Sequence, residues 1–232
     1  MVAQEQAKDR YERTRAELDD VCRSAGRDPR DVTLVAVSKT VGPEDVASAI
    51  SGGAHDFGEN RPDQLMLKAD EFTAENWHFI GNIQSRRIRD IVGRATLVHS
   101  LFEESHARKI DECARALGIV QDVLLEVNVS GEGSKSGLAP DDVMALLRTC
   151  SALPNVRVRG LMTMAPQGDL NVARQTFAGL RALRDALASE LSADEAGHFT
   201  ELSMGMSEDW REAVAEGATI VRIGRAIFSS TF

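Results

Sequence analysis

The chain has 232 residues, and its 27 Lys and Arg stand against 36 Asp and Glu, a formal net charge of −9. Hydrophobic residues make up 43% and charged residues 27% of the sequence, which is typical of a globular protein with its own core. The acidic balance argues against nucleic acid as the main partner, because phosphate backbones bind to basic surfaces.

The cysteines and the amino-terminal segment indicate a protein of the cell interior. Cys22, Cys113 and Cys150 are far apart and form no CxxC pair, so neither a zinc ribbon nor a thioredoxin motif is expected. Segment 1–15 is polar and lacks the apolar stretch of a signal peptide. No apolar run approaches the roughly 20 residues that cross a bilayer. We therefore expect a cytoplasmic protein with reduced cysteines and no contact with a membrane.

The hydrophobic pattern predicts strands that alternate with helices along the chain. Apolar residues at helical spacing predict a leading helix over 3–25, which ends at Gly26 and Pro29. The β-branched run Thr33–Val37 then predicts a strand that is covered on both faces. Further strands are expected at 55–57, 77–80, 96–99, 122–129, 156–162, 198–202 and 219–223. Helices are expected at 43–51, from Pro62, at 85–92, 103–117 and 141–150, along an apolar stripe from Phe177 to Leu191, and at 207–216, with a terminal turn at 225–228.

This alternation indicates an α/β fold with parallel strands and right-handed crossovers. Eight strands in 232 residues fit a single (β/α)8 TIM barrel with an extra N-terminal helix, and one domain over 1–232. An open doubly wound sheet would alternate in the same way, but it usually has a Gly-rich turn after an early strand. Here the first strand ends in Ser38-Lys39-Thr40 instead.

In such a barrel the functional residues lie at the carboxyl ends of the strands, and phosphate often binds after the seventh and eighth strands. The predicted strand ends carry Lys39, Asn60, Asn82, Asn128, Met162, Ser203 and Gly224. This set holds one amine and several amides, but no cluster of His, Asp or Glu. The sequence therefore predicts neither a metal site nor a two-carboxylate hydrolase, and it offers no catalytic residues.

Lys39 is the residue of this set with the most distinctive chemistry. A lysine that loses hydration beside an apolar core exists more readily as the free amine that Schiff-base formation requires. From spacing alone, a lysine that keeps its ammonium group in water is the more common case. Lys135, in the Gly- and Ser-rich segment 130–137, is expected to be an ordinary loop lysine.

Two segments near the carboxyl end predict a phosphate site. Ser203 and its small neighbours offer hydroxyl and backbone N–H groups before a helix, and Gly224 and Arg225 offer further N–H groups. We expect Ser203 to contact the phosphate. Ser207 is expected to be the N-cap of the following helix, because Glu208 and the next acid suit a first helical turn.

Three other residues leave two readings open. Arg222 faces the same way as Gly224, because side chains alternate along a strand. Inside the barrel it would need an anion or a ring acceptor, whereas outside it would pair with a helix carboxylate. Asn60 could contact a ligand or belong to the turn before Pro62, and Asn82 could equally be a turn residue.

Motifs across the whole chain resemble those of one protein family. They are LVAVSKT (34–40), FGEN (57–60), WHFIG (77–81), VHSL (98–101), EVNVSGEGSKSGL (126–138), GLMTMAP (160–166), LSMGMSEDW (202–210) and VRIGRAIF (221–228). On these residues the chain is similar to the pyridoxal phosphate homeostasis protein family (YggS/PROSC type), a barrel like the N-terminal domain of alanine racemase.

The resemblance implies a cofactor and its contacts. Pyridoxal 5′-phosphate (PLP) would be held as a Schiff base on Lys39, with Ser203, Gly224 and Arg225 near its phosphate, Arg222 at its pyridine nitrogen and Asn60 close to its ring. An arginine at that nitrogen weakens the electron sink on which PLP enzymes depend. Asn82 stands where the family commonly has histidine, and Arg225 where it commonly has threonine, which removes one hydroxyl from the phosphate site.

Three functions are compatible with these features. The favoured one is a monomeric PLP carrier that takes part in intracellular PLP homeostasis and yields PLP to apo PLP-dependent enzymes without turnover. An amino-acid racemase-like enzyme needs a base on each face of its substrate. In alanine racemase a separate domain supplies a tyrosine for this, whereas the only tyrosine here, Tyr11, lies in the leading helix. A class I aldolase would share the barrel and the lysine but lacks nearby acid–base residues.

Overall fold

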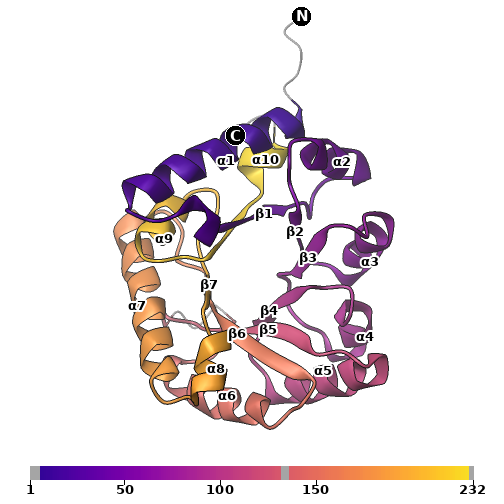
Figure 1. Cartoon of the computed structure of the whole chain (residues 1–232), viewed down its shortest axis with the longest axis vertical. Coiled ribbons are helices and arrows are strands. Elements are labelled where there is room, and N and C mark those ends of the chain that lie inside the picture. Colours follow the sequence, from indigo (N-terminus) through magenta and orange to yellow (C-terminus); the bar gives the residue numbers. More distant parts are fainter. Residues whose placement is uncertain (1–5, 132–135, 230–232) are drawn as a thin grey trace, which may run out of the picture.

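A closed barrel of eight parallel strands forms the centre of the computed structural model, which describes residues 6–131 and 136–229 (Figure 1). The strands follow one another around the barrel in sequence order, and β8 closes it by pairing with β1. They are β1 (Thr33–Val37), β2 (Asp56–Glu59), β3 (Asn76–Phe79), β4 (Leu97–Leu101), β5 (Gln121–Glu126), β6 (Val156–Met162), β7 (Glu201–Ser203) and β8 (Ile220–Ile223). The predicted α/β barrel is confirmed.

Helices surround the barrel and connect successive strands (Figure 1). They are α1 (Ala7–Ser24), α2 (Pro43–Ser51), α3 (Pro62–Glu71), α4 (Ile88–Ile91), α5 (Glu104–Leu117), α6 (Val143–Ser151), α7 (Leu170–Ala188), α8 (Ala193–His198), α9 (Trp210–Ala215) and α10 (Arg225–Phe228). The apolar stripe predicted in the long helix is the buried face of α7, where Phe177, Leu180 and Leu187 are inaccessible or nearly so. Burial of this face holds the helix on the strands.

The strands separate two apolar layers. Leu34 and Ala36 of β1 belong to the layer between strands and helices, whereas Val35 and Val37 point into the barrel. This alternation follows from the two-residue period of a strand. The same parity directs Lys39, two residues beyond Val37, toward the barrel axis at its carboxyl end.

The extra N-terminal helix predicted from the sequence is α1, which lies along the outside of the barrel against α2, α9 and α10 (Figure 1). Arg10 fixes it there, because its Nε donates a hydrogen bond of 2.7 Å to the backbone oxygen of Ile227. Tyr11 is buried in this outer interface, and burial raises the pKa of its phenol. The leading and closing segments of the chain are therefore packed together.

Two predicted boundaries near the carboxyl end are wrong. Residues 193–198 form α8, so the strand expected at 198–202 begins only at Glu201. The signal was present in the sequence as a capping box: Ser192 accepts from the N–H of Glu195, and the Glu195 carboxylate accepts from the N–H of Ser192. The helix expected from Ser207 begins only at Trp210.

Ser207 is consequently not the helix N-cap. That position is taken by Asp209, whose Oδ1 accepts a hydrogen bond of 2.6 Å from the N–H of Met206. This contact folds 206–209 into a turn ahead of the helix, which leaves the Ser207 side chain at the wall of a cavity. Lys135 lies outside the described residues.

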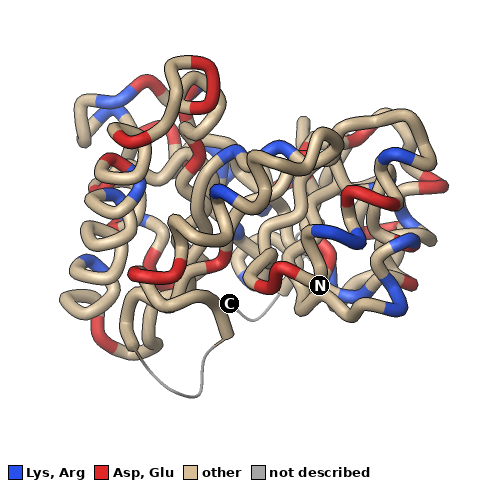
Figure 2. Tube along the Cα trace, turned by 90° about the horizontal axis from the view of Figure 1, so that it is seen from below, with Lys and Arg blue, Asp and Glu red and all other residues tan. Residues whose placement is uncertain are grey.

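Charged residues of both signs are interspersed along the backbone in the view of Figure 2. Many form short ion pairs along a helix, such as Arg108 with Glu104 on α5 at 2.6 Å. Among the helices in the described part of the chain, none has both the length and the apolar composition that a membrane crossing needs.

Candidate functional site

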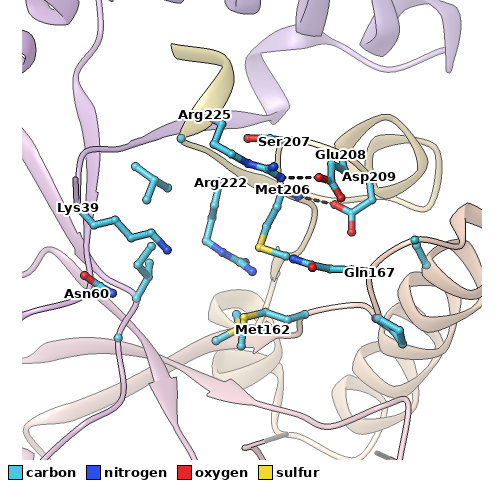
Figure 3. Close-up of a pocket in the computed structure, with 18 of the residues that line it drawn as sticks. Lys39, Asn60, Met162, Gln167, Met206, Ser207, Glu208, Asp209, Arg222 and Arg225 are labelled. Atoms are coloured by element: carbon cyan, nitrogen blue, oxygen red, sulfur yellow. Dashed lines mark hydrogen bonds and ion pairs between the residues drawn. The ribbon is translucent and has the colours of Figure 1, made fainter. Parts of the chain in front are cut away.

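A cavity of about 570 Å³ opens at the carboxyl ends of the strands (Figure 3). Cavities of this size are typical of sites for small molecules. Of the strand-end residues predicted from the sequence, the cavity brings together Lys39, Asn60, Asn82, Met162 and Gly224, and Arg222 and Arg225 line it as well. Ser203 and Asn128 are not among its lining residues. The position of the cavity agrees with the general placement of sites in such barrels.

Lys39 extends across the cavity toward the side that carries Arg222 (Figure 3). Lys39 lies two residues beyond the end of β1 and is exposed, so of the two readings that the sequence left open the structure shows the lysine that keeps its contact with water. Its amine is therefore accessible to a ligand that enters from solvent.

A buried ion pair fixes the backbone on which Lys39 stands. Lys68 of α3 donates hydrogen bonds to Glu59 Oε1 at 2.6 Å and to the backbone oxygen of Ser38 at 2.8 Å. The hydroxyl of Ser38 donates to the same Glu59 oxygen at 2.6 Å. Ser38 and Glu59 immediately precede Lys39 and Asn60, so this contact holds the two neighbouring strand ends in register.

Sequence reasoning missed Lys68 and Glu59. The available signal was helical spacing, because Lys68 lies one turn after the buried Leu65 on the apolar face of α3. A lysine on such a face requires an acceptor inside the protein.

Arg222 lies inside the barrel and forms part of the cavity wall, which decides between the two orientations that the sequence left open. Its Nη1 donates to Ser203 Oγ at 2.5 Å, and its Nη2 donates to the backbone oxygen of Thr163 at 3.1 Å. Burial lowers the pKa of Arg222 to about 10, so the guanidinium remains charged at neutral pH. The cavity therefore has a fixed cation on its floor.

The expectation that Ser203 contacts a phosphate does not agree with its position. Ser203 is completely buried beneath the cavity, and its hydroxyl is engaged by Arg222 and by His99 Nδ1, the latter at 2.9 Å. The loop after β7 instead presents Ser207 to the cavity.

The wall made by the segments after β7 and β8 carries Glu208, Asp209 and Arg225 (Figure 3). Arg225 and Glu208 form an ion pair of 2.6 Å there, with both side chains about half exposed. Burial raises the pKa of Asp209. Gly205 permits this arrangement because its φ is +92° and a Cβ would lie 2.6 Å from Ala213 Cβ.

The opposite wall carries two amides. Asn60 is half-buried after β2, and Asn82 is exposed after β3. The two strand ends approach closely at Gly81, where a Cβ would lie only 2.0 Å from the Asn60 backbone oxygen. A glycine is required at that position, which brings both amides to the same side of the cavity.

In the described ranges 6–131 and 136–229, no three His, Cys, Asp or Glu side chains gather in a way that could hold a metal ion. The side chains that line the cavity offer an amine, two guanidinium groups, three amides, three carboxylates and a hydroxyl.

The chain is similar over nearly its whole length to proteins of known family. The family described as alanine racemase, N-terminal domain, matches residues 12–231. A pyridoxal phosphate homeostasis protein of Aquifex aeolicus is 39% identical, over 95% of this chain and 96% of its own. One of Pseudomonas aeruginosa is 42% identical, over 93% and 91% of the two chains. The structure of PipY from Synechococcus elongatus with PLP bound has a TM-score of 0.80 and 35% identity, and covers 93% of this chain and all of that one.

Proposed function

Because the chain belongs to the family of pyridoxal phosphate homeostasis proteins, we propose that it binds PLP in this cavity and takes part in intracellular PLP homeostasis. The observation that carries the proposal is the placement of Lys39 and Arg222 on the walls of one cavity of about 570 Å³. PLP is an aldehyde with a phosphate and a basic ring. An amine can form a Schiff base with its aldehyde, and a fixed cation can donate a hydrogen bond to its ring nitrogen.

The lining supports PLP at its aldehyde and its ring. Lys39 Nζ is the primary amine that forms a Schiff base with an aldehyde, with loss of one water. Arg222 would meet the pyridine nitrogen, and a guanidinium can only donate hydrogen bonds, so it keeps that nitrogen unprotonated. Bound in this way, PLP supplies a reactive carbonyl but a weak electron sink. Asn60 lies on the wall beside Lys39 and would contact the ring.

The phosphate would bind at the wall formed after β7 and β8. Ser207, Gly224 and Arg225 line that wall, and a hydroxyl and backbone N–H groups can bind phosphate oxygens. The Arg225 guanidinium adds a positive charge, which its ion pair with Glu208 partly offsets. We assign the hydroxyl contact to Ser207 because Ser203 is buried beneath Arg222.

The lining supports a carrier rather than an enzyme with its own turnover. Among the described residues of the cavity wall there is no tyrosine, histidine or cysteine to act as a second base. Tyr11 is buried on the outside of the barrel in α1. Of the three acids at the wall, Glu208 pairs with Arg225, Asp209 accepts the N–H of Met206, and Asp169 accepts the N–H groups of Asn171 and Val172. We propose a cytoplasmic, monomeric protein that yields PLP to apo PLP-dependent enzymes.

The cofactor and its anchor are tested by the absorption spectrum of the purified protein with PLP, before and after borohydride reduction, and by mapping of the reduced peptide. We expect a visible band that bleaches and a reduced adduct on Lys39. Lys39→Ala should lose the adduct, whereas Lys109→Ala, at an exposed lysine of α5, should keep it. An unchanged adduct in Lys39→Ala would assign the anchor to another lysine.

The absence of turnover is tested separately. Racemisation of alanine by the PLP-loaded protein should not exceed that of free PLP at the same concentration, and faster racemisation would overturn the carrier proposal. Delivery is measured as the rate at which an apo PLP-dependent enzyme regains activity with the loaded protein as its only source of PLP.

A further inference from the structure

A chain of hydrogen bonds crosses the interior of the barrel, from the cavity floor toward the opposite end. It begins at Arg222, whose Nη1 lies 2.5 Å from Ser203 Oγ. Ser203 Oγ lies 2.9 Å from His99 Nδ1, and His99 Nε2 lies 2.9 Å from His78 Nδ1. The chain ends at the amino-terminal residue of β2, where His78 Nε2 lies 3.1 Å from Asp56 Oδ1.

The members of this chain come from β8, β7, β4, β3 and β2, so no local sequence motif unites them. Four of them are buried, and only the Asp56 side chain, 26% exposed, reaches solvent. They share the barrel interior with apolar side chains such as Val35 and Leu97. Polar groups in such surroundings are costly unless each finds a partner. Among the described residues, none of the buried polar atoms that lack a partner belongs to the chain.

Its two ends dictate the direction of the chain. A guanidinium can only donate hydrogen bonds, and an ionised carboxylate can only accept them. Burial lowers the pKa of His99 well below its usual value, so this imidazole is neutral and carries one ring proton. If the Ser203 hydroxyl accepts from Arg222 and donates to His99 Nδ1, every donor along the chain meets one acceptor.

The remaining protons then follow. His99 carries its proton on Nε2 and donates it to His78 Nδ1, and His78 donates from Nε2 to Asp56. A proton on Nδ1 of His99 would make Ser203 Oγ accept twice and would leave the serine proton without an acceptor in the chain. Only one of the two arrangements satisfies every member.

We propose that Ser203, His99 and His78 are positioning residues, which form a one-directional hydrogen-bond chain anchored on Asp56 that fixes the Arg222 guanidinium on the cavity floor. The second contact of Arg222, to the Thr163 backbone oxygen, comes from its other terminal nitrogen, so the two contacts set the plane of the group. The contact of Arg222 with PLP rests on the proposed function. The donor-to-acceptor direction of the hydrogen-bond chain does not depend on it.

The direction is tested on the protein without PLP by ¹⁵N–¹H correlation spectra of its imidazole rings, each assigned by a single His→Gln variant. The whole protein has five histidines, so its imidazole spectrum contains few signals. We expect His78 and His99 both to carry the ring proton on Nε2. A proton on Nδ1 of His99, or rapid exchange between its two forms, would overturn the proposal. This measurement uses the parent protein and is independent of PLP binding.

The anchoring role of Asp56 is tested in the same spectra. Asp56→Asn retains an acceptor oxygen, so His78 and His99 should both keep their ring proton on Nε2. Asp56→Ala removes the acceptor, so the His78 proton should exchange between Nδ1 and Nε2. The anchoring role is contradicted if His78 loses its fixed Nε2 proton in both variants, or keeps it in both.

The effect on Arg222 is tested by PLP titration. Ser203→Ala should weaken PLP binding roughly tenfold, because one hydrogen bond to a charged group is lost. Val35→Ala opens a comparable space in the same interior but leaves the hydrogen-bond chain intact, so this variant should bind PLP with the affinity of the parent. If Ser203→Ala binds as tightly as the parent while Arg222→Gln binds more weakly, the positioning role is wrong. If Arg222→Gln also binds as tightly, the proposed contact of Arg222 with PLP fails.

Discussion

The Nζ atom of Lys68 lies 2.6 Å from Oε1 of Glu59, and neither side chain has more than 1% of its surface exposed. This pair joins α3 to the end of β2, and through the Ser38 backbone oxygen it also reaches the end of β1. A buried ion pair contributes little net stability compared with apolar packing, but the loss of one partner leaves an uncompensated buried charge. The pair therefore holds the strand ends beneath Lys39 in one arrangement.

Lys68→Met should lower the free energy of unfolding by about 3–5 kcal/mol, because the Glu59 carboxylate would lose its counter-charge inside the protein. Urea unfolding followed by circular dichroism measures this loss. Lys109→Met, at an exposed position of α5, is the control and should change stability little. The double variant Lys68→Met/Glu59→Gln should be more stable than Lys68→Met alone. Equal stability of the two variants would show that the carboxylate is not the cause.

Stability should fall as the pH drops below about 6.5, partly because of His99. Burial lowers the pKa of His99 well below its usual value, so the unfolded chain takes up a proton that the folded protein does not. The contribution is complete above about pH 6.5 and is lost as the pH falls, with a slope of up to ~1.4 kcal/mol per pH unit.

Other buried groups act in the opposite direction. Burial raises the pKa of Glu126 and Asp209, so their contributions are lost as the pH rises through the folded-state pKa. Urea unfolding at pH 7.5 and 5.5 therefore has to be compared between the parent and His99→Gln, which should lack the His99 part of the slope. His198→Gln, at an exposed histidine of α8, should retain the parent slope. A parent slope in His99→Gln would assign the pH dependence elsewhere.

The barrel was predictable because hydrophobic periodicity acts locally. The residues of Thr33–Val37 predict a buried strand by themselves. Eight such segments separated by helices are compatible with only a few strand topologies. The errors at α8 and α9 were also local, and the capping box at Ser192 could have corrected the first of them. The second arose because Asp209, rather than Ser207, takes the N-cap.

The site was predictable in part, for a different reason. Asn60 and Gly224 follow β2 and β8 directly, and Lys39 lies two residues beyond β1, so their place at the cavity follows from the fold. Ser203 has the same sequence signal but lies one layer deeper, and only the packed barrel reveals that difference. The partners of Arg222 and Lys68 come from other strands and helices, so no spacing along the chain indicates them.

The three cysteines should differ strongly in reactivity toward iodoacetamide. Burial raises the pKa of Cys150 to about 12 and raises that of Cys22 as well, and both thiols are buried. The thiolate is the reactive form, so Cys113, which is partly exposed, should be alkylated first in the folded protein at pH 8. Peptide mapping follows the three sites, and all should react in urea. Early alkylation of Cys150 without urea would show that α6 opens readily.

The ion pair between Arg225 and Glu208 should set how strongly the cavity holds a phosphate. Both groups line the wall to which we assign the PLP phosphate. Arg225→Thr removes a cation and should weaken PLP binding about three- to tenfold at low salt, whereas Glu208→Gln removes a competing anion and should strengthen it. Both effects should shrink at high salt, since the pair is about half exposed.

Titration with PLP at two salt concentrations measures these changes. Arg108→Thr breaks a pair of similar length and exposure on α5, and it should leave PLP affinity unchanged. Since exposed pairs contribute little, none of the three variants should change the free energy of unfolding by more than about 1 kcal/mol. If Arg225→Thr binds PLP as tightly as the parent at low salt, the guanidinium does not contact the phosphate, and Ser207 with the backbone of Gly224 and of residue 225 must hold it.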